Sequence, residues 1–173
     1  MFLKEDYKPA PKSGGDYLNK FEEGDTKIRI MSDAITGWVY WTEEDNNRKP
    51  VRLKEAPEIV PVEAVQDKFG GYIKEFWAFT VWNYQESKIQ LCEITQATIK
   101  DAIFVLHSSE DWGDPKQYDL TITRTDGERT SYDVIPSPPT DIPLEAAEGL
   151  VAKPVNLKAL YDGKDPFEDK SAK

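Results

Sequence analysis

The chain has 173 residues and a net charge of −10 at pH 7, from 22 Lys and Arg against 32 Asp and Glu. Its single Cys and single His exclude a disulfide framework and a Cys-rich zinc module, and a hydrophobic share of 39% excludes full disorder. The sequence holds no apolar run near the ~18 residues of a spanning helix, and the N-terminus carries no apolar signal region. We therefore expect a soluble cytoplasmic protein with no membrane contact.

Composition divides the chain into three parts. Residues 1–25 are polar and rich in Pro and Gly, which predicts a flexible N-terminal arm. Residues 26–139 carry nearly all strand and helix patterns and end in a Pro-Ser-Pro-Pro run that stops regular structure. Residues 140–173 are rich in Ala, Lys and acids and are predicted to form a flexible C-terminal tail with at most a short helix near 146–150.

The first half of the central part predicts strands. Residues 26–31 alternate between apolar and polar side chains, as a half-buried strand does, and residues 37–42 form a second strand dense in aromatics. Residues 43–47 are a polar turn, after which 49–54 return as a short strand. Residues 55–73 contain several Pro and Gly and are predicted to be a long connection.

The second half predicts two hairpins around one helix. Residues 74–85 and 88–94 alternate on either side of a two-residue turn, which favours a hairpin. A helix with Thr95 as its N-cap follows, with apolar residues at helical spacing. Residues 118–125 and 129–135 then flank an Asp-Gly turn, a specific hairpin signal.

This element order predicts a mainly β fold. Antiparallel strands with one helix between hairpins favour a small five-stranded oligonucleotide/oligosaccharide-binding (OB) barrel with flexible arms at both ends. A β-sandwich or another small barrel stays open, because strand pairing does not follow from one sequence.

Catalytic chemistry is poorly represented. His107 falls at the end of the predicted helix, and Cys92 lies in an alternating strand, where a small packed side chain is the usual role. No nucleophile elbow, phosphate-binding loop or metal-ligand spacing occurs in the sequence. We therefore predict a binding protein without catalytic residues, metal or cofactor.

Aromatic side chains crowd two of the predicted strands, where residues two apart share a face. Trp38 and Tyr40 share one face of the first such strand. In the second, the more continuously apolar face is assigned to the core: Trp77, Phe79 and Val81. The opposite, outward face carries Phe76, Trp82 and Tyr84. Outward aromatics can stack on nucleic-acid bases, although aromatics that simply fill the core are the alternative.

Basic residues are interleaved with these aromatics. The predicted phosphate contacts are Lys27, Arg29, Arg48, Lys49, Arg52, Lys74 and Arg124. The acidic net charge argues against nucleic acid, but carboxylates more than ~10 Å away are largely screened at 0.1 M salt. Binding would then rely on base stacking more than on bulk charge.

Three stretches together resemble a family of bacteriophage single-stranded DNA-binding proteins. They are residues 20–42 (KFEEGDTKIRIMSDAITGWVYWT), 75–103 (EFWAFTVWNYQESKIQLCEITQATIKDAI) and 110–139 (EDWGDPKQYDLTITRTDGERTSYDVIPSPP). The resemblance implies an OB barrel that coats single-stranded DNA with little sequence preference. It also implies a role in replication, recombination or repair in the infected bacterial host cell.

The C-terminal part carries one further motif. Asp165, Pro166 and Phe167 are similar to the acidic, aromatic tips with which some single-stranded DNA-binding proteins recruit replication proteins, although here the motif is internal. We expect it to bind phage or host replication proteins or to compete with DNA. The alternative function is a protein-interaction or phage structural module whose aromatic face docks a partner chain. The oligomeric state does not follow from the sequence.

Overall fold

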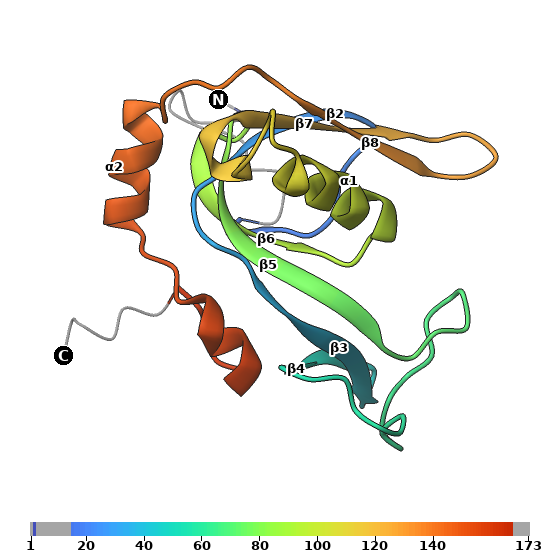
Figure 1. Cartoon of the computed structure of the whole chain (residues 1–173). Coiled ribbons are helices and arrows are strands. Elements are labelled where there is room, and N and C mark those ends of the chain that lie inside the picture. Colours follow the sequence, from blue (N-terminus) through green and yellow to red (C-terminus); the bar gives the residue numbers. More distant parts are fainter. Residues whose placement is uncertain (1, 3–14, 168–173) are drawn as a thin grey trace.

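The computed structural model describes residue 2 and residues 15–167, which form a mainly β fold with few helices (Figure 1). The strands are β1 Tyr17–Leu18, β2 Gly24–Ile30, β3 Ile35–Glu44, β4 Asn47–Leu53, β5 Lys74–Asn83, β6 Lys88–Ile94, β7 Asp119–Thr125 and β8 Ser131–Pro136. The helices are α1 Ala97–Ser108 and α2 Leu144–Ala152, with 3-10 turns η1 Pro115–Gln117 and η2 Leu157–Asp162. Within this part of the chain, no helix has the length and apolar character to cross a membrane.

All eight described strands belong to one sheet, ordered β1-β6-β5-β2-β7-β8, with β3 on β5 and β4 on β3. The long strand β5 lies at its centre. Its first half pairs with β3 and its second half with β2, while β6 pairs along its other edge. The predicted hairpins β5–β6 and β7–β8 and the return strand β4 are confirmed. All pairs are antiparallel except β1–β6, which is parallel.

A bend joins β2 to β3 and lets both follow β5. At the bend the Ser32 hydroxyl oxygen accepts a 2.8 Å hydrogen bond from the Thr80 N–H. Thr80 lies between the last residue of β5 paired with β3 and the first paired with β2, so neither strand pairs with it on this edge. Farther along, a side chain on Gly37 would lie 2.3 Å from the Leu53 carbonyl oxygen. Only Gly fits this close approach of two strands.

The prediction of a mainly β fold is confirmed, but the sheet is open and has more than five strands. Among the described residues, no strand pair joins β6 to β8. The N-terminal segment lies in this gap, because β1 pairs with β6 and the buried Phe21 contacts Tyr132 of β8, with ring centroids 6.4 Å apart. The Phe21 carbonyl oxygen also accepts a 2.7 Å hydrogen bond from Arg124 Nη1.

The predicted N-terminal arm is therefore too long. Leu18 and Phe21 are buried in the main core, so residues 17–21 belong to the folded domain. Two apolar side chains that would be costly in water explain why this segment packs. Residues 1 and 3–14 of the predicted arm lie outside the described residues.

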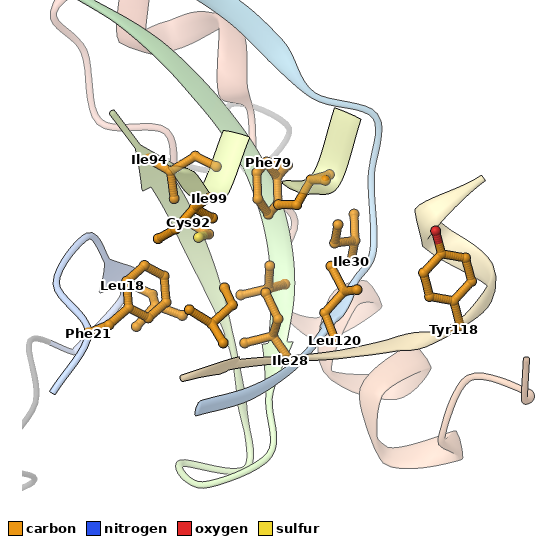
Figure 2. Packing of buried hydrophobic residues seen from close by; sticks show 13 residues of the cluster. Leu18, Phe21, Ile28, Ile30, Phe79, Cys92, Ile94, Ile99, Tyr118 and Leu120 are labelled. Carbon is orange, nitrogen blue, oxygen red and sulfur yellow. The ribbon is translucent and has the colours of Figure 1, made fainter. Parts of the chain in front are cut away.

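The main core lies between the inner side of the sheet and α1 (Figure 2). Figure 2 shows Phe79 of β5, Ile28 of β2 and Leu120 of β7 gathered with Ile99 of α1. The prediction that Phe79 and Val81 face the core is confirmed, and Trp77 packs against its edge. Gln96, not Thr95, is the N-cap of α1, and its side chain makes no capping hydrogen bond.

The outer face of β5 and β6 is covered by the C-terminal segment, residues 143–167. Trp82 and Ile89 pack against the buried Ala146 of α2, and Phe76 packs with Leu160 of η2. Residues 144–167 are therefore part of the fold, and the prediction that they form a flexible tail is wrong. Burial of apolar side chains on both surfaces explains the packing. Residues 168–173 lie outside the described part.

Candidate nucleic-acid interface

A cleft of about 230 Å³ lies where β3, the end of β6 and the 54–73 connection meet. Its walls carry two aromatic rings, Trp41 of β3 and Tyr72 of the connection, and three cationic side chains, Lys20, Arg48 and Lys74. Exposed aromatic rings and basic side chains thus share one concave surface here.

Both rings of the cleft are accessible to a ligand. Trp41 and Tyr72 are each 40% exposed. Their positions are linked, because the Val65 N–H donates a 2.7 Å hydrogen bond to the Trp41 carbonyl oxygen and so fastens the connection to β3. Large, partly exposed rings held on a fixed backbone are suited to stacking against planar groups.

Asp67 organises the end of the connection that carries Tyr72. Its carboxylate accepts 2.8 Å hydrogen bonds from the N–H groups of Phe69 and Gly71 and pairs with Lys74 Nζ at 2.9 Å. The hydrogen bond from Lys74, with those from the backbone, lowers the pKa of Asp67 to about 2. The carboxylate therefore stays ionised and holds the turn that leads into Tyr72.

The cations of the cleft differ in how strongly they are engaged. Lys20 is exposed and forms no ion pair with a described residue. Arg48 lies 3.8 Å from Glu43 in a pair that is half-exposed on both sides, and such pairs contribute little. Lys20 and Arg48 are consequently available to a phosphate group, whereas Lys74 is shared with Asp67.

Arg52 does not line the cleft, but it pairs with Glu93, which does. Its guanidinium makes a bidentate pair with Glu93 of β6, with Nε–Oε2 at 2.6 Å and Nη2–Oε1 at 3.1 Å. Both side chains are largely buried, so the predicted phosphate contact by Arg52 is not available in this structure. The pair instead ties β4 to β6.

The remaining predicted cations lie elsewhere. Arg29 is buried, with Nη1 3.4 Å from Asp119 Oδ1 and with hydrogen bonds to the carbonyl oxygens of Lys116 and Thr140. Its predicted role at phosphate is therefore corrected to a structural one. Lys27 lies over the Tyr84 ring, 4.9 Å from the centroid. The other predicted cations are Arg124, which pairs with Asp126, and the exposed Lys49 of β4.

The predicted stacking aromatics are mostly buried. Phe76 and Trp82 lie under the C-terminal segment, so the prediction that they face solvent is wrong, although their assignment to the face opposite Phe79 holds. Tyr40 is buried beneath the connection, and its hydroxyl donates a 3.0 Å hydrogen bond to Glu63. Trp38, also on the Tyr40 face, is half-buried.

Tyr84 is also engaged within the protein. Its hydroxyl donates a 2.7 Å hydrogen bond to Asp119 Oδ1. Partial burial, together with this carboxylate, raises the pKa of Tyr84 to about 12. The ring therefore belongs to a polar network around Asp119 and not to an open stacking surface.

The Asp165-Pro166-Phe167 motif is docked on the domain. The Phe167 ring meets Tyr17 edge-on with centroids 5.5 Å apart, and Lys153 Nζ lies 5.0 Å from the same ring. Pro166 is buried and Asp165 is exposed. The motif thus stabilises the C-terminal segment, while its predicted role in recruiting partners stays a prediction.

Sequence reasoning missed Trp41, Tyr72 and Lys20. Strand alternation does place Trp41 on the face opposite Tyr40, but only the fold of the connection decides which of the two is covered. Tyr72 follows Gly70 and Gly71, a signal for a turn that presents the next side chain. Lys20 sits in the segment that was assigned to the arm.

The described residues hold no cluster of three or more His, Cys, Asp or Glu side chains suited to a metal ion. Cys92 is buried, and burial raises the pKa of its thiol well above the ordinary value. No protein-family model, curated protein or solved structure matches the chain.

Proposed function

We propose that the protein binds and coats single-stranded DNA with little sequence preference, in replication, recombination or repair of phage DNA in the cytoplasm of an infected bacterium. The observation that carries the proposal is the cleft between Trp41 and Tyr72, with cations on its walls. Every base has a π-face, and stacking on an aromatic ring contributes ~1–3 kcal/mol per base whatever the sequence. Lys20 and Arg48 supply charge for the adjoining phosphates.

The strand order supports an OB barrel with one open seam as the underlying fold. In such a barrel the first strand pairs with the second and fourth, the second with the third, and the fourth with the fifth. The pairs of β5 with β2 and β3, of β5 with β6, of β2 with β7 and of β7 with β8 fit this order when β2 and β3 count as one bent strand. The helix α1 then lies between the third and fourth strands.

The position of the cleft supports the same function. OB folds bind oligonucleotides on the face of the second and third strands and at the loop between the first and second. Under the proposed order, that loop is the β4 hairpin with the 54–73 connection. The third strand, β6, ends at Ile94, and the flanking residues Glu93 and Thr95 line the cleft. The cleft therefore occupies the junction at which such folds take a base.

The test is a titration with oligo(dT) and with duplex DNA at two salt concentrations. We expect the single strand to bind and the duplex to bind weakly, because duplex bases are already stacked. With two cations of the cleft, Lys20 and Arg48, available to phosphates, the slope of log K against log salt is about −1.4 for a single strand, from ~0.7 per phosphate neutralised. Absence of oligo(dT) binding at low salt would overturn the proposal.

A protein-interaction module is the second candidate function. The 54–73 connection exposes four large apolar side chains, namely Ile59, Val60, Val62 and Phe69. Carboxylates of Glu58 and Glu63 lie in the same segment and repel phosphates. If this function holds, removal of the apolar side chains abolishes partner capture, and the protein is indifferent to DNA.

A further inference from the structure

A second pocket, of about 330 Å³, lies between α1, the β2–β3 bend and η1. It faces away from the cleft. The paired residues Thr36 and Trp77 line the pocket, whereas the pair Val39 and Lys74, three positions along the same strands, lines the cleft. Because neighbouring residues of a strand point to opposite faces, an offset of three separates the two sites by the thickness of the sheet.

The floor of the pocket is apolar and aromatic. Trp77 and Phe79 of β5 meet Ile103 of α1 there, and Phe104 stands at the side with 58% of its surface exposed. An exposed Phe on a helix leaves apolar surface in water unless something covers it. The volume is at the lower end of known ligand sites and accommodates one large apolar side chain.

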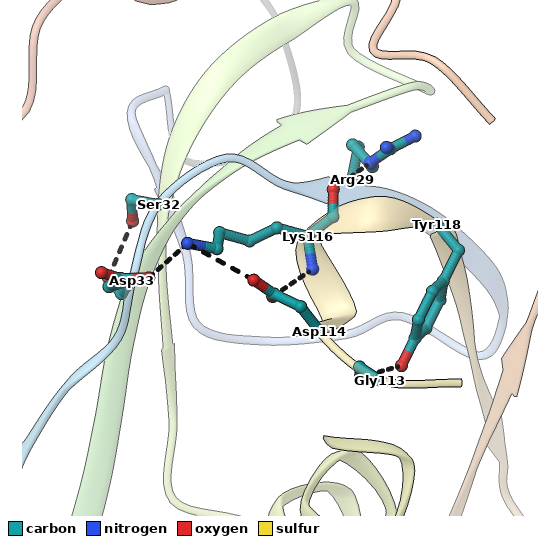
Figure 3. A network of polar contacts seen from close by, with 7 residues as sticks. All are labelled: Arg29, Ser32, Asp33, Gly113, Asp114, Lys116 and Tyr118. Carbon is teal, nitrogen blue, oxygen red and sulfur yellow. Dashed lines mark hydrogen bonds and ion pairs between the residues drawn. The ribbon is translucent and has the colours of Figure 1, made fainter. Parts of the chain in front are cut away.

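The mouth of the pocket is built from charged side chains held in place. Lys116 Nζ of η1 reaches across to Asp33 Oδ1 at 2.5 Å and lies 3.6 Å from Asp114 Oδ2 (Figure 3). The turn that carries Lys116 is itself fixed, because its N–H donates to Asp114 and its carbonyl oxygen accepts from Arg29 Nε, each at 2.9 Å.

Charge at the mouth selects against nucleic acid. Two carboxylates share the one ammonium group of Lys116, and the Asp33 side chain is 89% exposed. The hydrogen bond and charge of Lys116 lower the pKa of Asp33, so this carboxylate stays ionised. A phosphodiester would meet repulsion here, whereas Lys or Arg side chains would find complementary charge.

We propose that this pocket docks a basic segment of a protein partner, with one aromatic or large apolar side chain seated on Trp77 and Phe79. Cationic side chains flanking this anchor pair with Asp33 and Asp114 at the rim. A large side chain seated in a desolvated pocket is the usual anchor of an interaction hot spot, and complementary charges around it select the partner. The proposal is independent of DNA binding at the cleft.

The test uses the full chain labelled with ¹⁵N and the probe peptide acetyl-Lys-Phe-Lys-amide. We expect it to shift the Trp77 indole N–H and the backbone amides of Phe104 and His107 at millimolar concentration. Acetyl-Glu-Phe-Glu-amide should bind about fivefold more weakly or worse, since it meets like charge at the rim. Scattered shifts, equal affinity of the two peptides, or the same shifts on adding oligo(dT) would overturn the proposal.

Substitutions test the contribution of the rim carboxylates separately from that of the apolar surface of the pocket. The double change Asp33→Asn and Asp114→Asn should abolish the preference for the basic peptide, and Phe104→Ala should weaken both peptides. Asp101→Asn, at an exposed position of α1 outside the pocket, should leave both affinities unchanged. A preference that survives the double change contradicts the charge assignment, and the dispersion of the spectra confirms that each variant is folded.

Discussion

The N–H of Val65 donates a 2.7 Å hydrogen bond to the carbonyl oxygen of Trp41, although the residues lie on different elements. This one bridge fastens the 54–73 connection to β3 and forms a wall of the cleft from both. With the connection in this position, Tyr40 is buried beneath it, whereas the Trp41 ring stays 40% exposed. The candidate interface therefore depends on this fold of the connection.

Removing either ring of the cleft should weaken DNA binding. Trp41→Ala or Tyr72→Ala should cost ~1–3 kcal/mol in the binding free energy for oligo(dT), a loss of about 5- to 150-fold in affinity. The matched control is Phe69→Ala, because Phe69 lies on the same connection, is 82% exposed and does not line the cleft. Calorimetric titration provides the measurement, and equal losses at Phe69 and Tyr72 would argue against a defined stacking site.

Removing a cation of the cleft should lower the salt dependence. Lys20→Gln and Arg48→Gln should each reduce the slope of log K against log salt by ~0.7, because each removes one phosphate contact. Lys164→Gln, at an exposed position away from the cleft, should not change the slope. Fluorescence anisotropy of labelled oligo(dT) from 50 to 300 mM salt measures this, and unchanged slopes in both cleft variants would contradict the phosphate assignment.

Arg29 should act on stability and not on DNA affinity. Arg29→Met removes three hydrogen-bonded contacts and leaves the buried Asp119 carboxylate short of a partner, at a cost of ~3–5 kcal/mol in the free energy of unfolding. Arg29→Lys should restore little, because an ammonium lacks the planar fork of donors. Urea unfolding measures the loss. A variant with native stability and reduced DNA affinity would show that Arg29 contacts DNA and would contradict its structural role.

The C-terminal segment should depend on the glycine of α2. A side chain on Gly149 would lie 3.3 Å from the Trp82 ring and 3.3 Å from Ile89, both buried. Gly149→Leu should therefore push α2 off the sheet, at ~1–3 kcal/mol from overpacking, and red-shift the Trp fluorescence. Val151→Leu on the exposed side of α2 is the control. An unshifted spectrum for Gly149→Leu would mean that Trp82 is not packed under α2.

The turn held by Asp67 should be acid-sensitive. The pKa of Asp67 in the fold, about 2, lies below its ordinary value, so the ionised carboxylate favours the folded turn. Its contribution is complete above about pH 4 and is lost as pH falls through about 2. The Gly71 amide chemical shift reports the transition, and Asp67→Asn should remove it. A midpoint near pH 4 would contradict the hydrogen bonds assigned to this carboxylate.

Local patterns predicted the strands from β2 to β8, the hairpins, α1 and the two faces of β5, but not β1, which was assigned to the N-terminal arm. Alternation separated Phe79 from Phe76 correctly, because adjacent strand residues point to opposite sides. Alternation does not show which face is exposed to solvent. The Phe76 face is buried because residues 143–167 cover it, and their few apolar positions predicted only a short helix near Ala146.

Several predicted binding residues are buried instead, because the residues that cover or pair with them are distant in the sequence. Arg29 belongs to the polar face of β2, but its neighbour across the sheet is Asp119, and a buried ion pair requires a partner that the local sequence does not disclose. Tyr40 was selected on this strand and Trp41 was not, because the local sequence does not show that the connection folds over the Tyr40 side of β3. Arg48 and Lys74 were placed at the interface from sequence and do line the cleft.

The most direct test of DNA binding at the cleft is quenching of Trp fluorescence by oligo(dT), compared between the native protein, Trp41→Phe and Trp82→Phe. Trp41 lines the cleft and Trp82 is buried beneath α2. If DNA stacks on Trp41, oligo(dT) should quench the fluorescence of the native protein and of Trp82→Phe, and most of the quenching should be lost in Trp41→Phe. Quenching that persists in Trp41→Phe but vanishes in Trp82→Phe, or no quenching at low salt in any of the three, would contradict this stacking.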